Sequence, residues 1–79
     1  MGAKLELYGG LKERMGGDTL EVESGISIAQ LIERLATDNP GASELLKNSL
    51  AAINEEVVDE EKIIGEGETL HLMPPYSGG

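Results

Sequence analysis

Apolar and polar residues alternate in two segments near the start of the chain. Residues 3–8 are Ala-Lys-Leu-Glu-Leu-Tyr, and residues 19–23 are Thr-Leu-Glu-Val-Glu. A period of two is typical of a strand with one buried face, so the two segments predict an antiparallel pair of strands. The predicted inward-facing residues are Leu5, Leu7, Leu20 and Val22. Between the strands, Leu11–Met15 has apolar ends four residues apart and glycine pairs on both sides, which predicts one helical turn.

A helical pattern follows the second strand. Ser27 and Gln30, three residues apart, form the capping box that is typical of a helix N-terminus. The apolar residues Ile28, Leu31, Ile32 and Leu35 then follow at i, i+3, i+4 and i+7, which places one apolar stripe along the helix. Pro40-Gly41 ends the pattern. We therefore predict a helix over Ile28–Asp38.

Shorter apolar segments make up the second half of the chain. Residues 42–48 are ambiguous and allow a further short helical turn. Leu50–Ile53 predicts a strand, residues 54–56 a turn, and Val57-Val58 a brief return strand. We expect Ile63-Ile64 to pack back against the core.

The last strand is predicted over Thr69–Met73, after a glycine-rich turn at residues 65–68. Leu70 and Leu72 then lie on one face, and His71 and Met73 on the other.

One helix with one apolar stripe, together with strands that have one apolar face, predicts a single mixed sheet wrapped over the helix. The crossover that contains the helix allows the last strand to run parallel to the first. This arrangement is a β-grasp fold of the α+β class, with four to five strands packed on one main helix. We expect one β-grasp domain over residues 1–73 and an extended, flexible C-terminal tail over residues 74–79.

The composition narrows the available chemistry. The chain of 79 residues has no cysteine and one histidine. Disulfides, a cysteine nucleophile and cysteine-ligated metals are therefore excluded, and a Ser-His-Asp triad is disfavoured. The acidic residues between Glu55 and Glu61 lack the spacing of a calcium loop, and His71 has no second strong ligand beside it in the pattern. We expect no metal site.

The charge of the chain bears on its partners. Fifteen acidic and six basic residues give a net charge of −9, which disfavours nucleic acid and favours basic protein partners. No apolar run reaches the length of a membrane span, and no apolar signal segment precedes the first strand. We therefore expect no membrane association and a cytoplasmic location.

The last six residues, 74–79, are Pro-Pro-Tyr-Ser-Gly-Gly. Two prolines cannot continue a central strand and favour an extended conformation. Two terminal glycines arise by chance in roughly one chain in two hundred. A terminal glycine carboxylate, however, has no side chain and can enter a narrow channel in another protein. It is a poor electrophile until it is activated, for example by acyl adenylation with ATP, so the pattern points to chemistry at Gly79.

The chain resembles the MoaD/ThiS family of ubiquitin-like sulfur carriers over nearly its whole length. The segments that carry the resemblance are Lys4–Tyr8, Leu11–Met15, the helix after Ile26-Ser27, residues 50–54, residues 65–68 and the C-terminal tail. The ending Pro-Pro-x-Ser-Gly-Gly is most similar to that of the small subunit of molybdopterin synthase. The segment Thr69-Leu70-His71-Leu72 is also similar to the last strand of ubiquitin. The chain departs from many members of the molybdopterin branch at Leu72-Met73, where paired phenylalanines are common.

The resemblance implies a two-stage cycle at Gly79. An adenylating enzyme of the MoeB kind would use ATP to convert the Gly79 carboxylate to an acyl adenylate, and a persulfide donor would leave a thiocarboxylate there. The carrier with its thiocarboxylate would dock on a large subunit of the MoaE kind and donate sulfur to cyclic pyranopterin monophosphate, forming the dithiolene of molybdopterin. The carrier would be a non-catalytic subunit that binds no cofactor stably. The tail residues that would enter the partner's active site are Pro74, Pro75, Tyr76, Ser77 and Gly78.

The similarity to ubiquitin also implies a partner surface formed by Tyr8, Ala52, His71 and Met73. A solvated surface histidine is the alternative interpretation of His71. Three other functions stay open: a protein modifier attached to lysines through Gly79, a sulfur carrier for another pathway such as thiamine biosynthesis, and a β-grasp binding module without terminal chemistry.

Overall fold

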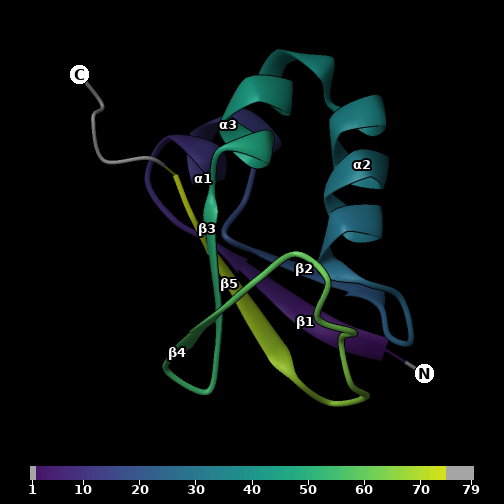
Figure 1. Ribbon diagram of the computed structural model, residues 1–79. Coiled ribbons are helices and arrows are strands. Elements are labelled where there is room, and N and C mark those ends of the chain that lie inside the picture. The colour runs from purple at the N-terminus through teal and green to yellow at the C-terminus, as the bar shows by residue number, and fades with distance from the viewer. Residues whose placement is uncertain (1, 75–79) are drawn as a thin grey trace.

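Residues 2–74 fold into a five-stranded mixed sheet and three short α-helices (Figure 1). The computed structural model describes residues 2–74. The strands are β1 (Gly2–Leu7), β2 (Thr19–Glu23), β3 (Leu50–Ile53), β4 (Glu56–Val58) and β5 (Thr69–Met73). The helices are α1 (Gly10–Met15), α2 (Ile28–Asp38) and α3 (Ser43–Lys47), with a 3-10 turn, η1, at Pro40–Ala42. The strand order is β2-β1-β5-β3-β4, so β1 and β5 lie inside the sheet and β2 and β4 form its edges.

The register of the sheet agrees with the alternation in the sequence. β1 pairs antiparallel with β2 and parallel with β5, and β5 pairs antiparallel with β3. The parallel register sets Leu5 beside Leu70 and Leu7 beside Leu72. All four leucines are buried on the helix side of the sheet, where they meet Ile28 and Leu31 of α2 in one core cluster. The predicted β-grasp topology is therefore confirmed.

The N-terminus of α2 is held by its own cap and by the segment that precedes β5. The Gln30 amide donates to Ser27 Oγ over 3.1 Å, and the Ser27 amide donates to Gln30 Oε1 over 3.0 Å, which completes the predicted capping box. The Ile28 and Ala29 amides donate to the carbonyl oxygens of residues 62 and 60 over 2.9 and 2.8 Å. The first amides of the helix therefore have partners, and the loop after β4 is fixed against α2.

Two segments differ from the sequence prediction. The ambiguous residues 42–48 contain the end of η1 and all of α3, because Leu46 packs fully buried in the core. Ile64 is buried as expected, but Ile63 is 52% exposed, so the expectation that both isoleucines pack inward is wrong for Ile63. The backbone at Ile63 forms an isolated antiparallel bridge with Ser27, and successive side chains of an extended segment point in opposite directions.

A tight turn joins β3 and β4. Asn54 and Glu55 both have positive φ, at 55° and 66°, and they form the two-residue connection of this hairpin. Glu56 belongs to β4 and not to the turn, one residue earlier than the sequence pattern predicts.

No helix within residues 2–74 has the length and apolar character needed to cross a bilayer.

Candidate functional site

The sheet face opposite α2 brings together the four residues predicted as a partner surface. Pairing sets His71 beside both Glu6 and Ala52, and the alternation of β5 sends His71 and Met73 to the side away from the buried leucines. Tyr8 directly follows β1 and contacts His71 from there. Ala52 is only 8% exposed but is not part of the core cluster, which contains its neighbours Ala51 and Ile53.

Two further residues, Leu50 and Val57, extend this surface. Leu50 pairs with Met73, and Val57 pairs with Ala52 across the β3–β4 hairpin. Leu50 is 50% exposed and Val57 65% exposed. We name the surface the open-face patch; its residues are Tyr8, Leu50, Ala52, Val57, His71 and Met73. Among the described residues, the large apolar side chains that are exposed are Tyr8, Leu50, Val57 and Ile63, so three of the four lie in this patch.

The sequence pattern does not identify Leu50 and Val57 as surface residues of the patch. Leu50–Ile53 is an apolar run, which does not tell which side chains face the core. The pairing of Val57 with Ala52 in a short hairpin would have placed Val57 on the patch side. That pairing register depends on which residues form the turn.

A hydrogen-bonded network orients Tyr8 within the patch. The Tyr8 hydroxyl lies 2.8 Å from His71 Nδ1 and donates to Glu6 Oε1 over 3.2 Å, while His71 Nδ1 lies 3.5 Å from the same carboxylate oxygen. The two rings are tilted with centroids 5.8 Å apart. The hydroxyl has one proton, so when it donates to Glu6 the short contact with His71 requires a proton on Nδ1. The network therefore fixes an aromatic ring on a surface that is suited to docking.

Partial withdrawal of the Tyr8 ring from water raises the pKa of its hydroxyl above the ordinary value of 10.0. The hydrogen bond to Glu6 and the negative charge of that carboxylate raise it further. The hydroxyl is thus held in its neutral form, as a hydrogen-bond donor rather than a nucleophile.

The end of β5 places the beginning of the tail against the β1–α1 connection. The Tyr8 amide donates to the Leu72 carbonyl over 3.2 Å, and Gly9 follows with φ 57° and ψ −134°. A Cβ atom built on Gly9 would lie 3.1 Å from Pro74 Cγ and 3.7 Å from Pro74 Cδ. The missing side chain of Gly9 therefore makes room for the proline ring where the chain leaves the sheet. The other predicted tail residues, Pro75, Tyr76, Ser77, Gly78 and Gly79, lie outside the described residues.

Residues 2–74 contain no group of three or more His, Asp or Glu side chains placed to hold a metal ion. The open-face patch is therefore a contact surface that lies beside the start of the tail.

The raised pKa of Tyr8 predicts a pH dependence of stability. The folded state holds the hydroxyl proton more tightly than the unfolded chain, so this stabilisation is complete below pH 10.0 and is lost as the pH rises through the folded pKa. In a Tyr76→Phe background, which leaves Tyr8 as the single tyrosine, phenolate absorbance should titrate with a midpoint above 10.0. Glu6→Gln should lower that midpoint. Glu21→Gln, which removes the same charge on β2, should leave it nearly unchanged, and an equal shift in both variants would contradict the local role of Glu6.

The contact between Gly9 and Pro74 predicts a position-specific cost of a methyl group. Gly9→Ala should lower the free energy of unfolding by about 1–3 kcal/mol, because alanine disfavours this backbone conformation and its methyl group would press on the proline ring. Gly16→Ala is the matched control: Gly16 also has positive φ, at 79°, but an added Cβ would meet no atom within 4 Å. Urea denaturation should show a smaller loss for the control. Pro74→Ala should recover part of the loss in Gly9→Ala and none in Gly16→Ala; equal behaviour of the two glycines would show that the contact has no effect.

Comparison with known proteins gives these features a context. Residues 5–79 match the model of the ThiS family. The molybdopterin synthase sulfur carrier subunit of Dictyostelium discoideum is 30% identical over an alignment that covers 96% of this chain and 94% of that protein.

Solved structures share the fold at lower identity. The small archaeal modifier protein 1 of Methanosarcina acetivorans has a TM-score of 0.82 at 19% identity, covering 99% of this chain and 96% of that one. A chain in the complex of subunits 1 and 2 of molybdopterin-converting factor from Helicobacter pylori has a TM-score of 0.70 at 20% identity, with both chains fully covered. The family match and the Dictyostelium relative confirm the resemblance noted in the sequence: the chain belongs to the ThiS family and is a ubiquitin-like sulfur carrier of the MoaD/ThiS type.

Proposed function

We propose that this carrier is the small subunit of a molybdopterin synthase and that its C-terminal Gly79 carries the sulfur. The observation that supports this pathway most strongly is the 30% identity to the Dictyostelium sulfur carrier subunit along nearly the whole of both chains. The sequence Pro-Pro-Tyr-Ser-Gly-Gly at residues 74–79 agrees with it, because prolines favour an extended chain and glycine puts no side chain beside the proposed reactive carboxylate.

The proposed chemistry activates the Gly79 carboxylate. One of its oxygens attacks the α-phosphorus of ATP in a MoeB-like adenylating enzyme, and pyrophosphate leaves. A persulfide sulfur then attacks the acyl carbon, and AMP leaves. Reduction of the resulting sulfur–sulfur bond by a thiol leaves the thiocarboxylate. The carrier with its thiocarboxylate finally donates this sulfur to cyclic pyranopterin monophosphate in a MoaE-like large subunit. The side chains of that subunit supply the catalysis. We place the cycle in the cytoplasm, where ATP is supplied. The activating enzyme binds that ATP, so we assign no stable cofactor to the carrier.

The open-face patch is the surface on which we expect these partners to dock. It lies at the end of β5 from which Pro74 leads away, so a partner that covers the patch also receives the start of the tail. The related complex from Helicobacter contains subunits 1 and 2 of a molybdopterin-converting factor, which supports a MoaE-like partner. The net charge of −9 favours partners with basic surfaces and should speed their encounter with the carrier.

Intact mass spectrometry tests the tail chemistry directly. Incubation of the chain with the adenylating enzyme, ATP and a persulfide donor should replace one oxygen by one sulfur. A chain that lacks Gly78 and Gly79 should stay unmodified under the same conditions. Modification of the truncated chain would contradict a role for the terminus, and adducts found solely on lysines of other proteins would favour the protein modifier.

The role of the open-face patch has a matched pair of surface variants. Val57 lies in the patch and is 65% exposed, whereas Ile63 is 52% exposed outside it, so a charge at either position should leave the fold intact. Val57→Lys should raise the KM of the adenylating enzyme for the carrier by about tenfold, since burying a charge against apolar groups of a partner costs on the order of 1–2 kcal/mol. Ile63→Lys should leave this KM within about twofold. Equal KM values for the two variants would place the docking surface elsewhere.

A further inference from the structure

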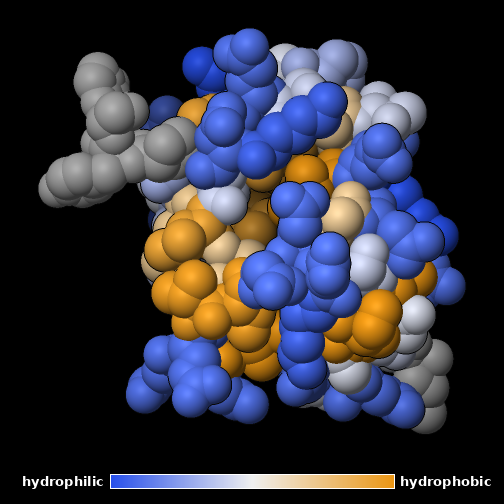
Figure 2. Space-filling view, in the orientation of Figure 1, coloured by the Kyte–Doolittle hydropathy of each residue, from blue (hydrophilic) through white to orange (hydrophobic). Residues whose placement is uncertain are grey.

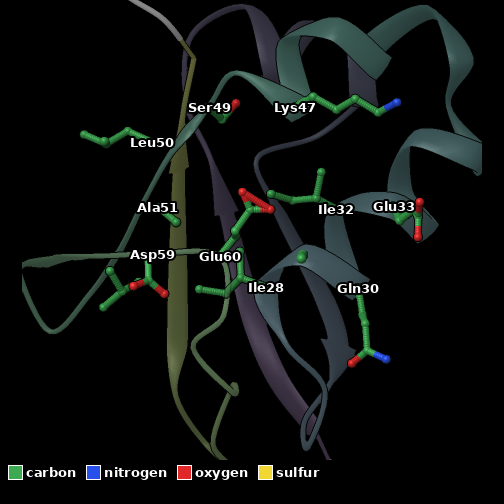
Figure 3. Close-up of a pocket in the computed structure, with 12 residues that line it drawn as sticks. Ile28, Gln30, Ile32, Glu33, Lys47, Ser49, Leu50, Ala51, Asp59 and Glu60 are labelled. Atoms are coloured by element: carbon green, nitrogen blue, oxygen red, sulfur yellow. The ribbon is translucent and has the colours of Figure 1, made fainter.

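A groove runs between α2 and the β3–β4 hairpin, on the side of the sheet opposite the open-face patch (Figure 3). Its volume is about 600 Å³. The apolar lining comes from Ile28 and Ile32 of α2, from Leu50 and Ala51 of β3 and from Val58 of β4. Leu50 also belongs to the open-face patch, so the two surfaces meet at this residue. Figure 2 shows apolar surface over the β3–β4 region, with hydrophilic groups above it and to its right.

Small side chains keep this groove open. Ala29, in the first turn of α2, and Ala51, on the groove side of β3, are both among its lining residues. Neither side chain extends far enough to fill the space between helix and hairpin. The floor of the groove is formed by the buried core residues Ile28 and Ala51, while Ile32 and Val58 at its sides are partly exposed.

The carboxylate of Glu60 stands over this apolar lining. In Figure 3 its side chain points into the space between β3 and α2, toward Ile32. Glu33 and Asp59 add two more carboxylates at the rim. The one cationic group among the lining residues belongs to Lys47, and its side chain points away from Glu60. No ion pair within residues 2–74 includes Glu33, Asp59 or Glu60.

We propose that this groove is a second docking site, which accepts a basic segment of a partner protein through an arginine or lysine side chain. The aliphatic stem of such a residue covers apolar surface while its charged head stays at the rim, which fits an apolar lining with a carboxylate above it. The cation would pair with Glu60, and an apolar residue next to it in the partner would occupy the space beside Ala51.

The charge of the groove selects this occupant over others. A second copy of this chain has a net charge of −9, so the three rim carboxylates would repel it. Phosphate backbones and anionic membranes would be repelled for the same reason. None of the residues that line the groove takes part in the proposed sulfur transfer, so the test of the groove is independent of that proposal.

Titration of the isotope-labelled chain with capped hexapeptides tests the proposal by amide NMR. A peptide of alternating leucine and arginine should give saturable shifts at Ile28, Ile32, Ala51 and Val58. A peptide of alternating glycine and arginine should bind at least about fivefold more weakly, because it lacks the apolar contact. A peptide of alternating leucine and glutamate should give no saturable shifts at these residues.

Variants of neighbouring glutamates supply the matched control. Glu60→Gln should weaken binding of the leucine–arginine peptide by about fivefold, in line with the loss of one exposed ion pair. Glu61→Gln removes the same net charge from an exposed neighbour that does not line the groove, and it should change binding by less than about twofold. Ala29→Leu should fill the groove and abolish the groove shifts without loss of stability, since leucine is a good helix former.

Three results would overturn the proposal. Equal binding of the two arginine peptides would show attraction to the acidic chain as a whole. Equal weakening by Glu60→Gln and Glu61→Gln would have the same meaning. Shifts confined to the open-face patch would show that the peptide binds the other side of the sheet.

Discussion

The parallel pairing of β1 with β5 at the centre of the sheet is the constraint on which the other features of this molecule depend. Its register sets Leu5 beside Leu70 and Leu7 beside Leu72, and the core buries all four side chains. A slip of one residue in either strand would turn its leucines toward water, at about 1.5–3 kcal/mol for each side chain. The same register sets Glu6 beside His71 on the opposite face. It also brings the end of β5 to the β1–α1 connection, where Pro74 meets Gly9.

Local chemistry explains which parts of the fold could be predicted from the sequence. The α2 boundaries follow from Ser27, Gln30 and Pro40, whose effects act within a few residues, and the structure has the helix over the predicted Ile28–Asp38. The orientation of Ile63 could not be predicted in this way. It depends on a bridge to Ser27, more than thirty residues earlier in the chain, and no local pattern of the segment specifies that contact.

The candidate site shows the same division between local and long-range information. His71 could be placed on the open face because β5 alternates clearly, and the similarity to ubiquitin implied that Tyr8 shares this face; the structure has the two side chains in contact. Leu50 and Val57 could not, since their position depends on the register of the β3–β4 hairpin. That register follows from two successive residues with positive φ, for which Asn-Gly is the usual pair, whereas this chain has Asn54-Glu55.

The hairpin of β3 and β4 also determines how the two surfaces of the molecule relate. Ala51 and Val58 pair with each other and face the groove, while Ala52 and Val57 pair with each other and face the open-face patch. β4 is an edge strand, and its successive side chains point to opposite faces, so the two surfaces are separated at this edge by the thickness of the sheet. A partner that reaches around this edge can contact the aromatic, largely apolar patch on one side and the acidic groove on the other. The proposed groove binds a cation, whereas the patch binds apolar groups. Two partners that both bind the patch can therefore differ in whether they also have a basic segment for the groove. This difference allows the carrier to distinguish between the two partners.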